Sequence, residues 1–251
     1  MSEFKKPSPK ASFFLGVGAT VIVGFIIGFF VLLSIVVKDN NSAADKSANT
    51  GQPSVAAGSA QPGAVPSQDI ELAVITDKDW IRGNPDAKVS VVEFSDLECP
   101  FCKRFHATMN QVMADYGDKV NWVYRHFPLT SLHSKAPREA EATECAGEQG
   151  GNDGFWAYTD KLFEVTPSNN GLLESQLPQI AEDVGLDKEK FVECLNSGKY
   201  TEKVQSQTSE AVAAGGQGTP YSVIITPDGE KIPVSGAVPY EQIKSFLDQV
   251  L

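Results

Sequence analysis

The distribution of apolar and polar residues divides the chain into three parts. An apolar run without a charged residue extends from Ala11 to Val37. Residues 38–69 are rich in Ala, Ser, Gly, Pro, Asn and Gln and offer little that could form a core. From residue 70 to residue 251, short β-branched and aromatic runs alternate with segments of helical periodicity. We therefore expect a single folded domain over residues 70–251.

The folded part begins with a strand–helix–strand pattern. Residues 89–94 form a β-branched and aromatic run typical of a buried strand. Apolar residues at helical spacing follow, with Pro100 suited to the first turn and an end expected near Gly117. A second strand is predicted over residues 120–127. This is a βαβ unit, whose crossover should be right-handed.

A long helical insertion is predicted after this unit, from about residue 131 to residue 215. We expect helices near 133–149, 153–165, 173–184, 187–197 and 199–214. Strands return at residues 221–226 and 231–234, and a last helix covers 239–250. The pattern predicts an α/β fold with an inserted all-helical domain.

Cys99-Pro100-Phe101-Cys102 provides the candidate chemistry. We expect Cys99 at the exposed N-terminus of the predicted helix and Cys102 one turn inside it. Unpaired N–H groups and the positive end of the helix dipole lower the pKa of a thiol in that position. Cys102 could then attack a mixed disulfide formed on Cys99. Glu93, six residues upstream in the strand, is a candidate for relaying the Cys102 proton.

Other uses of paired cysteines fit less well. A zinc site needs further Cys or His residues at close spacing, and none follows. A c-type haem needs His directly after the second cysteine, where Lys103 stands. A purely structural disulfide remains open. We expect a redox-active pair that uses neither a metal nor a cofactor.

The segment from Val91 to Cys102 (VVEFSDLECPFC) resembles the active-site segment of the DsbA-type thiol:disulfide oxidoreductases of the thioredoxin superfamily. Further matches extend the resemblance from about Asp79 to Leu251. It implies a thioredoxin fold with the inserted helical domain. It also implies that Gly218-Thr219-Pro220-Tyr221 is the cis-proline loop facing the thiols, with Thr219 beside the sulfurs.

The resemblance implies an enzyme that oxidises exported proteins and is reoxidised by a quinone-linked membrane partner. Pro100-Phe101 departs from the Pro-His pair of the best-known members, which leaves the direction of electron flow open. A reductase or isomerase fed by a membrane electron donor is therefore an alternative. A tethered, non-catalytic peptide-binding or chaperone module is a second one.

The remaining cysteines and the histidines carry weaker signals. Cys145 and Cys194 both lie in the helical insertion. In an exported domain such a pair favours a structural disulfide, whereas in a reducing compartment both would be buried thiols. A second redox pair is a further alternative. His106 is expected at the surface or an edge, and His126 and His133 receive no assigned chemistry.

The N-terminal part predicts location and partners. Lys5, Lys6 and Lys10 precede the apolar run, which favours a cytoplasmic N-terminus over residues 1–10. Residues 11–37 are long enough to be a single transmembrane anchor, and residues 38–69 to be a disordered linker. A cleaved signal peptide is the alternative, since Ser42-Ala43-Ala44 resembles a cleavage site.

We therefore expect a single-pass protein of the inner (cytoplasmic) membrane with its catalytic domain in the periplasm or another extracytoplasmic space. Its partners would be reduced or misoxidised exported proteins and a membrane redox protein. The formal net charge of −11 argues against a nucleic-acid partner.

Overall fold

The structure is a computed structural model that describes residues 70–251. The predicted cytoplasmic N-terminus (1–10), membrane anchor (11–37) and linker (38–69) lie outside the described residues and stay predictions. Within the described residues, no helix has both the length and the apolar character needed to cross a membrane.

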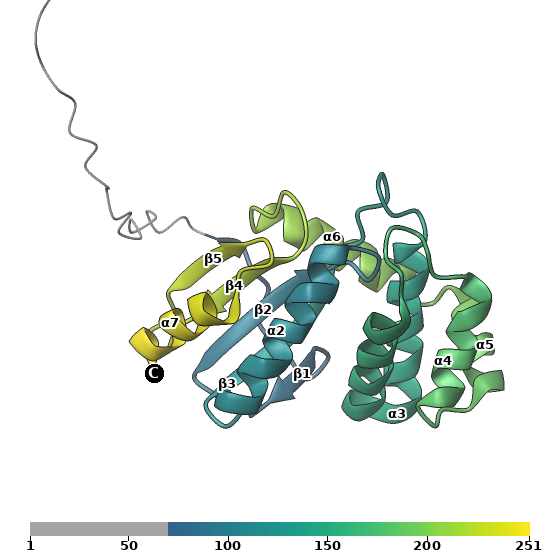
Figure 1. The fold of residues 1–251 in the computed structure, drawn as a ribbon, viewed down its shortest axis with the longest axis horizontal. Coiled ribbons are helices and arrows are strands. Elements are labelled where there is room, and N and C mark those ends of the chain that lie inside the picture. Colours follow the sequence, from purple (N-terminus) through teal and green to yellow (C-terminus); the bar gives the residue numbers. More distant parts are fainter. Residues whose placement is uncertain (1–69) are drawn as a thin grey trace, which may run out of the picture. The chain divides into compact units, whose positions relative to one another are not determined.

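A five-stranded sheet forms the centre of the described domain (Figure 1). Its strands, in spatial order, are β1 (Trp80–Gly83), β3 (Val120–His126), β2 (Val89–Ser95), β4 (Tyr221–Ile225) and β5 (Lys231–Ser235). Strands β2 and β3 are parallel, and the other three neighbouring pairs are antiparallel. Helix α2 (Pro100–Tyr116) connects the parallel pair, as the strand–helix–strand pattern predicts.

The helical insertion lies between β3 and β4 (Figure 1). It contains α3 (Ala136–Val165), the 3₁₀ turn η1 (Glu174–Gln176), α4 (Leu177–Asp183), α5 (Lys188–Ser197) and α6 (Thr201–Ala213), and the domain ends with α7 (Tyr240–Val250). The two helices expected near 133–149 and 153–165 are halves of α3, separated by a kink at Gly151 with φ 63° and ψ −153°. The helix expected near 173–184 is shorter than predicted, because its first turn is η1.

Side chains of β2 alternate between two cores, as the two-residue period of a strand requires. Val91 belongs to the larger core, which includes residues of α2, α3 and α7. Val92 and Phe94 belong to a smaller core with Ala211 of α6. Glu93 lies two positions from Val91 and so shares its face of the sheet. This alternation places a carboxyl group on the face of the sheet that α2 covers.

Candidate active site

Cys99 is the N-cap residue of α2, directly before Pro100. Its φ of −79° and ψ of 121° are extended, and the helix begins at proline, whose missing N–H leaves no hydrogen bond unmade there. Cys99 is only 4 % exposed, so the expectation of an exposed cysteine is wrong. The loop before β4 contributes to this burial, because the carbonyl oxygen of Thr219 lies 3.5 Å from the Cys99 sulfur.

The Cys99 thiol is a strong acid for a cysteine. Its pKa falls to about 6, chiefly through the hydrogen bond from the Cys102 thiol. Burial opposes this effect, while Thr219 and the backbone N–H groups of Phe101 and Cys102 lower the pKa further. These N–H groups are free because the first turn of a helix has no partners for them. At neutral pH, Cys99 is mainly a thiolate.

Cys102 is fully buried one turn inside α2. Burial raises its pKa well above the usual value, and the negative charges of Cys99 and Glu93 add to the rise. Its sulfur accepts a hydrogen bond from the Asp96 backbone N–H at 3.4 Å. Both cysteines are free thiols in this structure. The reduced pair therefore consists of one thiolate and one thiol with different chemical roles.

Glu93 is fully buried under this pair. The Trp122 indole N–H donates to Glu93 Oε2 at 2.9 Å, and Glu93 Oε1 has no hydrogen-bond partner. Burial raises the Glu93 pKa to about 7, against the hydrogen bond from Trp122, which lowers it. A carboxyl group that titrates near neutral pH beside a thiol can exchange a proton with it. The role of proton relay stays a prediction.

The loop before β4 provides the opposite side of the site. The peptide bond between Thr219 and Pro220 is cis. The Thr219 carbonyl faces Cys99, and the Thr219 hydroxyl is buried without a hydrogen-bond partner. The structure thus brings Cys99, Cys102, Glu93 and this loop into one site.

Two buried acidic residues between β2 and α2 anchor loops that are distant in the sequence. Asp96 accepts hydrogen bonds from Leu129 N at 2.8 Å and His133 Nδ1 at 2.9 Å. Glu98 carboxylate oxygens accept hydrogen bonds from the backbone N–H groups of residues 170–172, with N–O distances of 2.6 to 3.3 Å. Sequence reasoning missed both roles, because the partners lie more than 30 and more than 70 positions away and no local pattern marks them.

The loop that Glu98 holds has an unusual backbone. Ser168, Asn169 and Asn170 have positive φ values of 64°, 53° and 63°, a conformation that non-glycine residues adopt only when the surroundings impose it. Lys135 Nζ also binds this loop, through two carbonyl oxygens at 2.7 and 2.6 Å. Glu139 lies beside Glu98, and burial together with that neighbour raises its pKa to about 9. Glu139 is therefore protonated at neutral pH.

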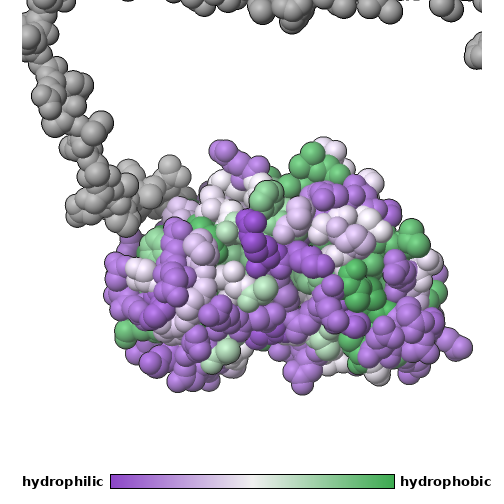
Figure 2. All heavy atoms as spheres, in the orientation of Figure 1, coloured by the Kyte–Doolittle hydropathy of each residue, from purple (hydrophilic) through white to green (hydrophobic). Residues whose placement is uncertain are grey.

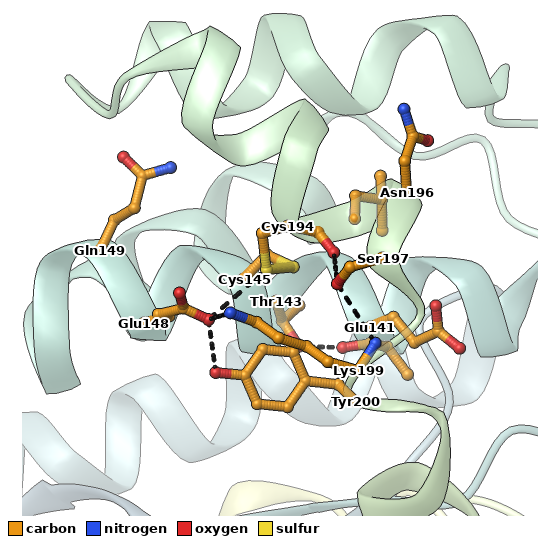
Figure 3. The surroundings of a disulfide bond; sticks show 12 residues. Glu141, Thr143, Cys145, Glu148, Gln149, Cys194, Asn196, Ser197, Lys199 and Tyr200 are labelled. Atoms are coloured by element: carbon orange, nitrogen blue, oxygen red, sulfur yellow. Dashed lines mark hydrogen bonds and ion pairs between the residues drawn. A yellow bond between two sulfur atoms is a disulfide. The ribbon is translucent and has the colours of Figure 1, made fainter.

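Cys145 of α3 and Cys194 of α5 form a disulfide (Figure 3). They are 1 % and 8 % exposed. Glu148, Lys199 and Tyr200 gather beside the bond, and Glu148 pairs with Lys199 and accepts the Tyr200 hydroxyl at 2.8 Å. The disulfide joins two helices of the insertion.

The expectation that His106 lies at the surface or an edge is wrong. It is 4 % exposed, because α2 packs against α3 on this side. Its Nε2 is 2.6 Å from Asp160 Oδ1, and its ring lies 5.0 Å from Trp122 and 4.6 Å from Phe163. Burial lowers its pKa against the opposing effect of Asp160, so His106 is neutral at neutral pH.

Apolar side chains are exposed on the elements that frame the site. Phe101 of α2 is 53 % exposed, while Leu132 and Leu173, on the two anchored loops, are 66 % and 59 % exposed. Figure 2 shows that polar groups cover most of the visible face of the domain and that apolar groups gather in separate patches. The site is thus buried at the sulfurs and apolar at parts of its margin.

A dithiol at the start of the helix that follows a central strand, facing a cis-proline loop, defines a thioredoxin-fold protein with a CxxC site. The chain belongs to the thioredoxin family. The sequence model of this family, which carries the description thioredoxin, matches residues 76–249. Among residues 70–251, no three His, Cys, Asp or Glu side chains are grouped so that they could hold a metal ion.

Solved structures with the same fold include DsbA proteins. The domain is similar to Pseudomonas aeruginosa DsbA2, with 27 % identity, a TM-score of 0.60, and coverage of 68 % of this chain and 93 % of that one. It is also similar to a thioredoxin-like oxidoreductase from Silicibacter pomeroyi DSS-3, with 28 % identity, a TM-score of 0.58, and coverage of 68 % and 91 %. The family and these neighbours support thiol–disulfide exchange as the chemistry of the site.

The curated relatives are longer proteins. The Na(+)/H(+) antiporter NhaA 1 of Mycolicibacterium gilvum is 36 % identical over 146 residues, which make up 57 % of this chain and 23 % of that protein. The chain thus spans about a quarter of the length of the curated relatives it matches. Their name describes those whole proteins.

Proposed function

We propose that the protein is an extracytoplasmic thiol:disulfide oxidoreductase that oxidises reduced, newly exported proteins through Cys99 and Cys102. The observation that carries the proposal is that the pKa values of the two thiols are shifted in opposite directions. The Cys99 pKa falls to about 6, whereas burial raises that of Cys102. A stabilised Cys99 thiolate favours the reduced pair, which makes the disulfide form a good electron acceptor.

The reaction is a two-step exchange. A substrate thiolate attacks Cys99 Sγ of the enzyme disulfide, a mixed disulfide forms, and Cys102 leaves as a thiolate. A second substrate thiolate then attacks the substrate sulfur of the mixed disulfide and releases Cys99 as a thiolate. The substrate loses two electrons and gains a disulfide, and the enzyme pair is reduced.

Glu93 supplies the proton that this reaction needs inside the domain. When Cys102 is released from the disulfide, its sulfur is fully buried, and burial makes an unprotonated thiolate unfavourable there. Glu93 has a pKa of about 7 and an unpartnered buried oxygen. It protonates Cys102 during oxidation of the substrate and takes the proton back when the pair is reoxidised.

The proposed setting is the outer side of the cytoplasmic membrane. Residues 11–37 anchor the chain, residues 38–69 tether the domain, and a membrane redox protein reoxidises Cys99 and Cys102. The Cys145–Cys194 disulfide supports an oxidising compartment, because such bonds persist there and are rare in a reducing cytosol.

The direction of the reaction is tested by the equilibrium of Cys99 and Cys102 with glutathione. We expect a reduction potential well above that of thioredoxin, which is about −270 mV. A value at or below that of thioredoxin would exclude the oxidase and favour the reductase. Oxidation of a reduced, unfolded disulfide protein by the purified chain provides the parallel activity measurement.

The setting is tested separately by protease treatment of intact spheroplasts. We expect the folded domain to be digested from outside in cells that express the full chain. Protection from the protease would contradict the extracytoplasmic location and leave the chemistry of the site untouched.

A further inference from the structure

A buried acidic residue, Asp96, lies on the backbone segment directly before Cys99. Asp96 is 1 % exposed and stands three positions before Cys99. Its carbonyl oxygen accepts the Cys99 N–H at 3.1 Å, and its own N–H reaches the Cys102 sulfur at 3.4 Å. A negative charge on a side chain of this segment would disfavour a thiolate at Cys99, because like charges repel strongly where water is excluded. A positive charge paired with Asp96 would remove this repulsion.

His133 occupies the position where such a charge is needed. Its Nδ1 is 2.9 Å from Asp96 Oδ2, and its side chain is 7 % exposed. Its backbone N–H donates to the Leu129 carbonyl at 2.8 Å, which fixes the loop that carries it. Burial lowers the pKa of His133, but the negative charges of Asp96 and Cys99 and a hydrogen bond with Asn169 outweigh it and raise the pKa above the usual value.

Among the described residues, His133 is the one basic side chain that forms an ion pair with Asp96. Glu139, which faces Asp96, is protonated at neutral pH because its pKa is raised to about 9. Lys135 Nζ is held by the carbonyl oxygens of Asn170 and Leu172. Glu98 adds a further acidic group, whose oxygens are occupied by backbone N–H groups. Position 101 between the cysteines is Phe and contributes no charge.

We propose that His133 is a positioning residue for thiol–disulfide exchange, which pairs with Asp96, cancels the anion beside Cys99 and so keeps the Cys99 thiolate stable. The inference rests on the proposed function and concerns the same site. Cys102, Thr219 and the helix N–H groups act on Cys99 directly. His133 adds to them from a loop that begins only after β3.

The test is a charge cycle at the two positions. His133→Gln leaves Asp96 uncompensated, so the Cys99 pKa should rise by about one unit, which is a tenfold shift of the glutathione equilibrium toward the enzyme disulfide. Asp96→Asn should shift the Cys99 pKa in the opposite direction, and the double variant should return close to the wild type. The readouts are the ultraviolet absorbance of the thiolate against pH and the glutathione equilibrium.

The matched control is His106→Gln, another buried histidine paired with a carboxylate, which should leave the Cys99 pKa unchanged. If His133→Gln does not fold, the double variant compared with Asp96→Asn alone measures the same charge and should show the same upward shift. A Cys99 pKa that is equal in the folded variants with and without His133 would overturn the inference. A wild-type Cys99 pKa near that of a free thiol would instead overturn the proposed function.

Discussion

The two cysteine pairs of this domain differ in spacing, state and surroundings. Cys99 and Cys102 lie one turn apart at the start of α2 and are free thiols. Cys145 and Cys194 are separated by 49 positions and are joined. The first pair meets free helix N–H groups, a buried carboxyl group and a cis-proline loop. The second joins α3 to α5, with Glu148, Lys199 and Tyr200 at its edge (Figure 3).

The comparison separates two uses of the same sulfur chemistry. Unequal acidity within the first pair lets one sulfur be attacked and released while the other holds a proton. The second pair closes a long loop and restricts the unfolded chain, which is how a disulfide stabilises a fold in the chain-entropy description. One pair should therefore determine activity and the other stability.

The largest contrast is expected in activity. Cys99→Ala should abolish oxidation of a reduced protein, because no sulfur remains for the substrate to attack. Cys145→Ala/Cys194→Ala, assayed at a temperature where it is folded, should retain it. Exchange rates of the two variants and the wild type provide the measurement. Full activity in Cys99→Ala would support the non-catalytic alternative.

Stability should show the reverse contrast. Removing the disulfide with Cys145→Ala/Cys194→Ala should lower the free energy of unfolding by about 4 kcal/mol, as expected for a closed loop of this length. Cys99→Ala should change it far less. Denaturant unfolding of both variants tests this, and equal losses would show that the second pair is not the main structural crosslink.

Glu93→Gln should show that the stability of the region around the first cysteine pair depends on pH. The Glu93 pKa is raised from 4.5 to about 7, so the folded dithiol form keeps the Glu93 proton more tightly than the unfolded chain does. The free energy of unfolding is therefore highest below pH 4.5 and decreases as the pH rises through 7. The uncharged Gln variant should therefore be more stable than the wild type at pH 8, by about 3 kcal/mol or less, and show no such gain at pH 4.

The same variant should slow exchange by about a hundredfold if Glu93 relays the Cys102 proton. Unfolding curves at the two pH values and exchange rates measured on the same preparation provide the data. An equal effect on stability at both pH values would contradict a charged Glu93 in the folded protein at pH 8. Unchanged exchange would contradict the relay alone.

The smallest effect is expected at the loop before β4. Thr219→Val removes the buried hydroxyl beside Cys99 while keeping the shape of the side chain. Because Thr219 lowers the Cys99 pKa, the variant should raise it by about half a unit, a roughly threefold change in equilibrium. A lower pKa in Thr219→Val would show that the hydroxyl acts against the thiolate.

Much of the fold could be predicted from local sequence patterns. Local signals include the β-branched run at 89–94, Pro100 at the start of α2 and Gly117 after its end. They place β2 and α2 close to their observed bounds. The two helices predicted near 133–149 and 153–165 are the halves of α3, so the predicted break falls at the kink. The dithiol was found because its motif is contiguous, whereas the proline loop was expected only from the family resemblance.

The rest of the site depends on contacts between distant residues. Asp96 with His133 and Glu98 with residues 170–172 are brought together only by the folding of the insertion against α2. His106 was misplaced for the same reason, because its burial depends on α3 rather than on its own helix. The burial of Cys99 likewise comes in part from Thr219, 120 positions away. Such contacts leave no periodic or local signal in a single sequence.

The central claim is that Cys99 is a stabilised thiolate within an unequal pair. Its most direct test is a pH titration of the Cys99 thiolate absorbance in the reduced domain with the Cys145–Cys194 bond intact. The account predicts a pKa of about 6 for Cys99. Titration near the free-thiol value of about 8.5 would contradict it.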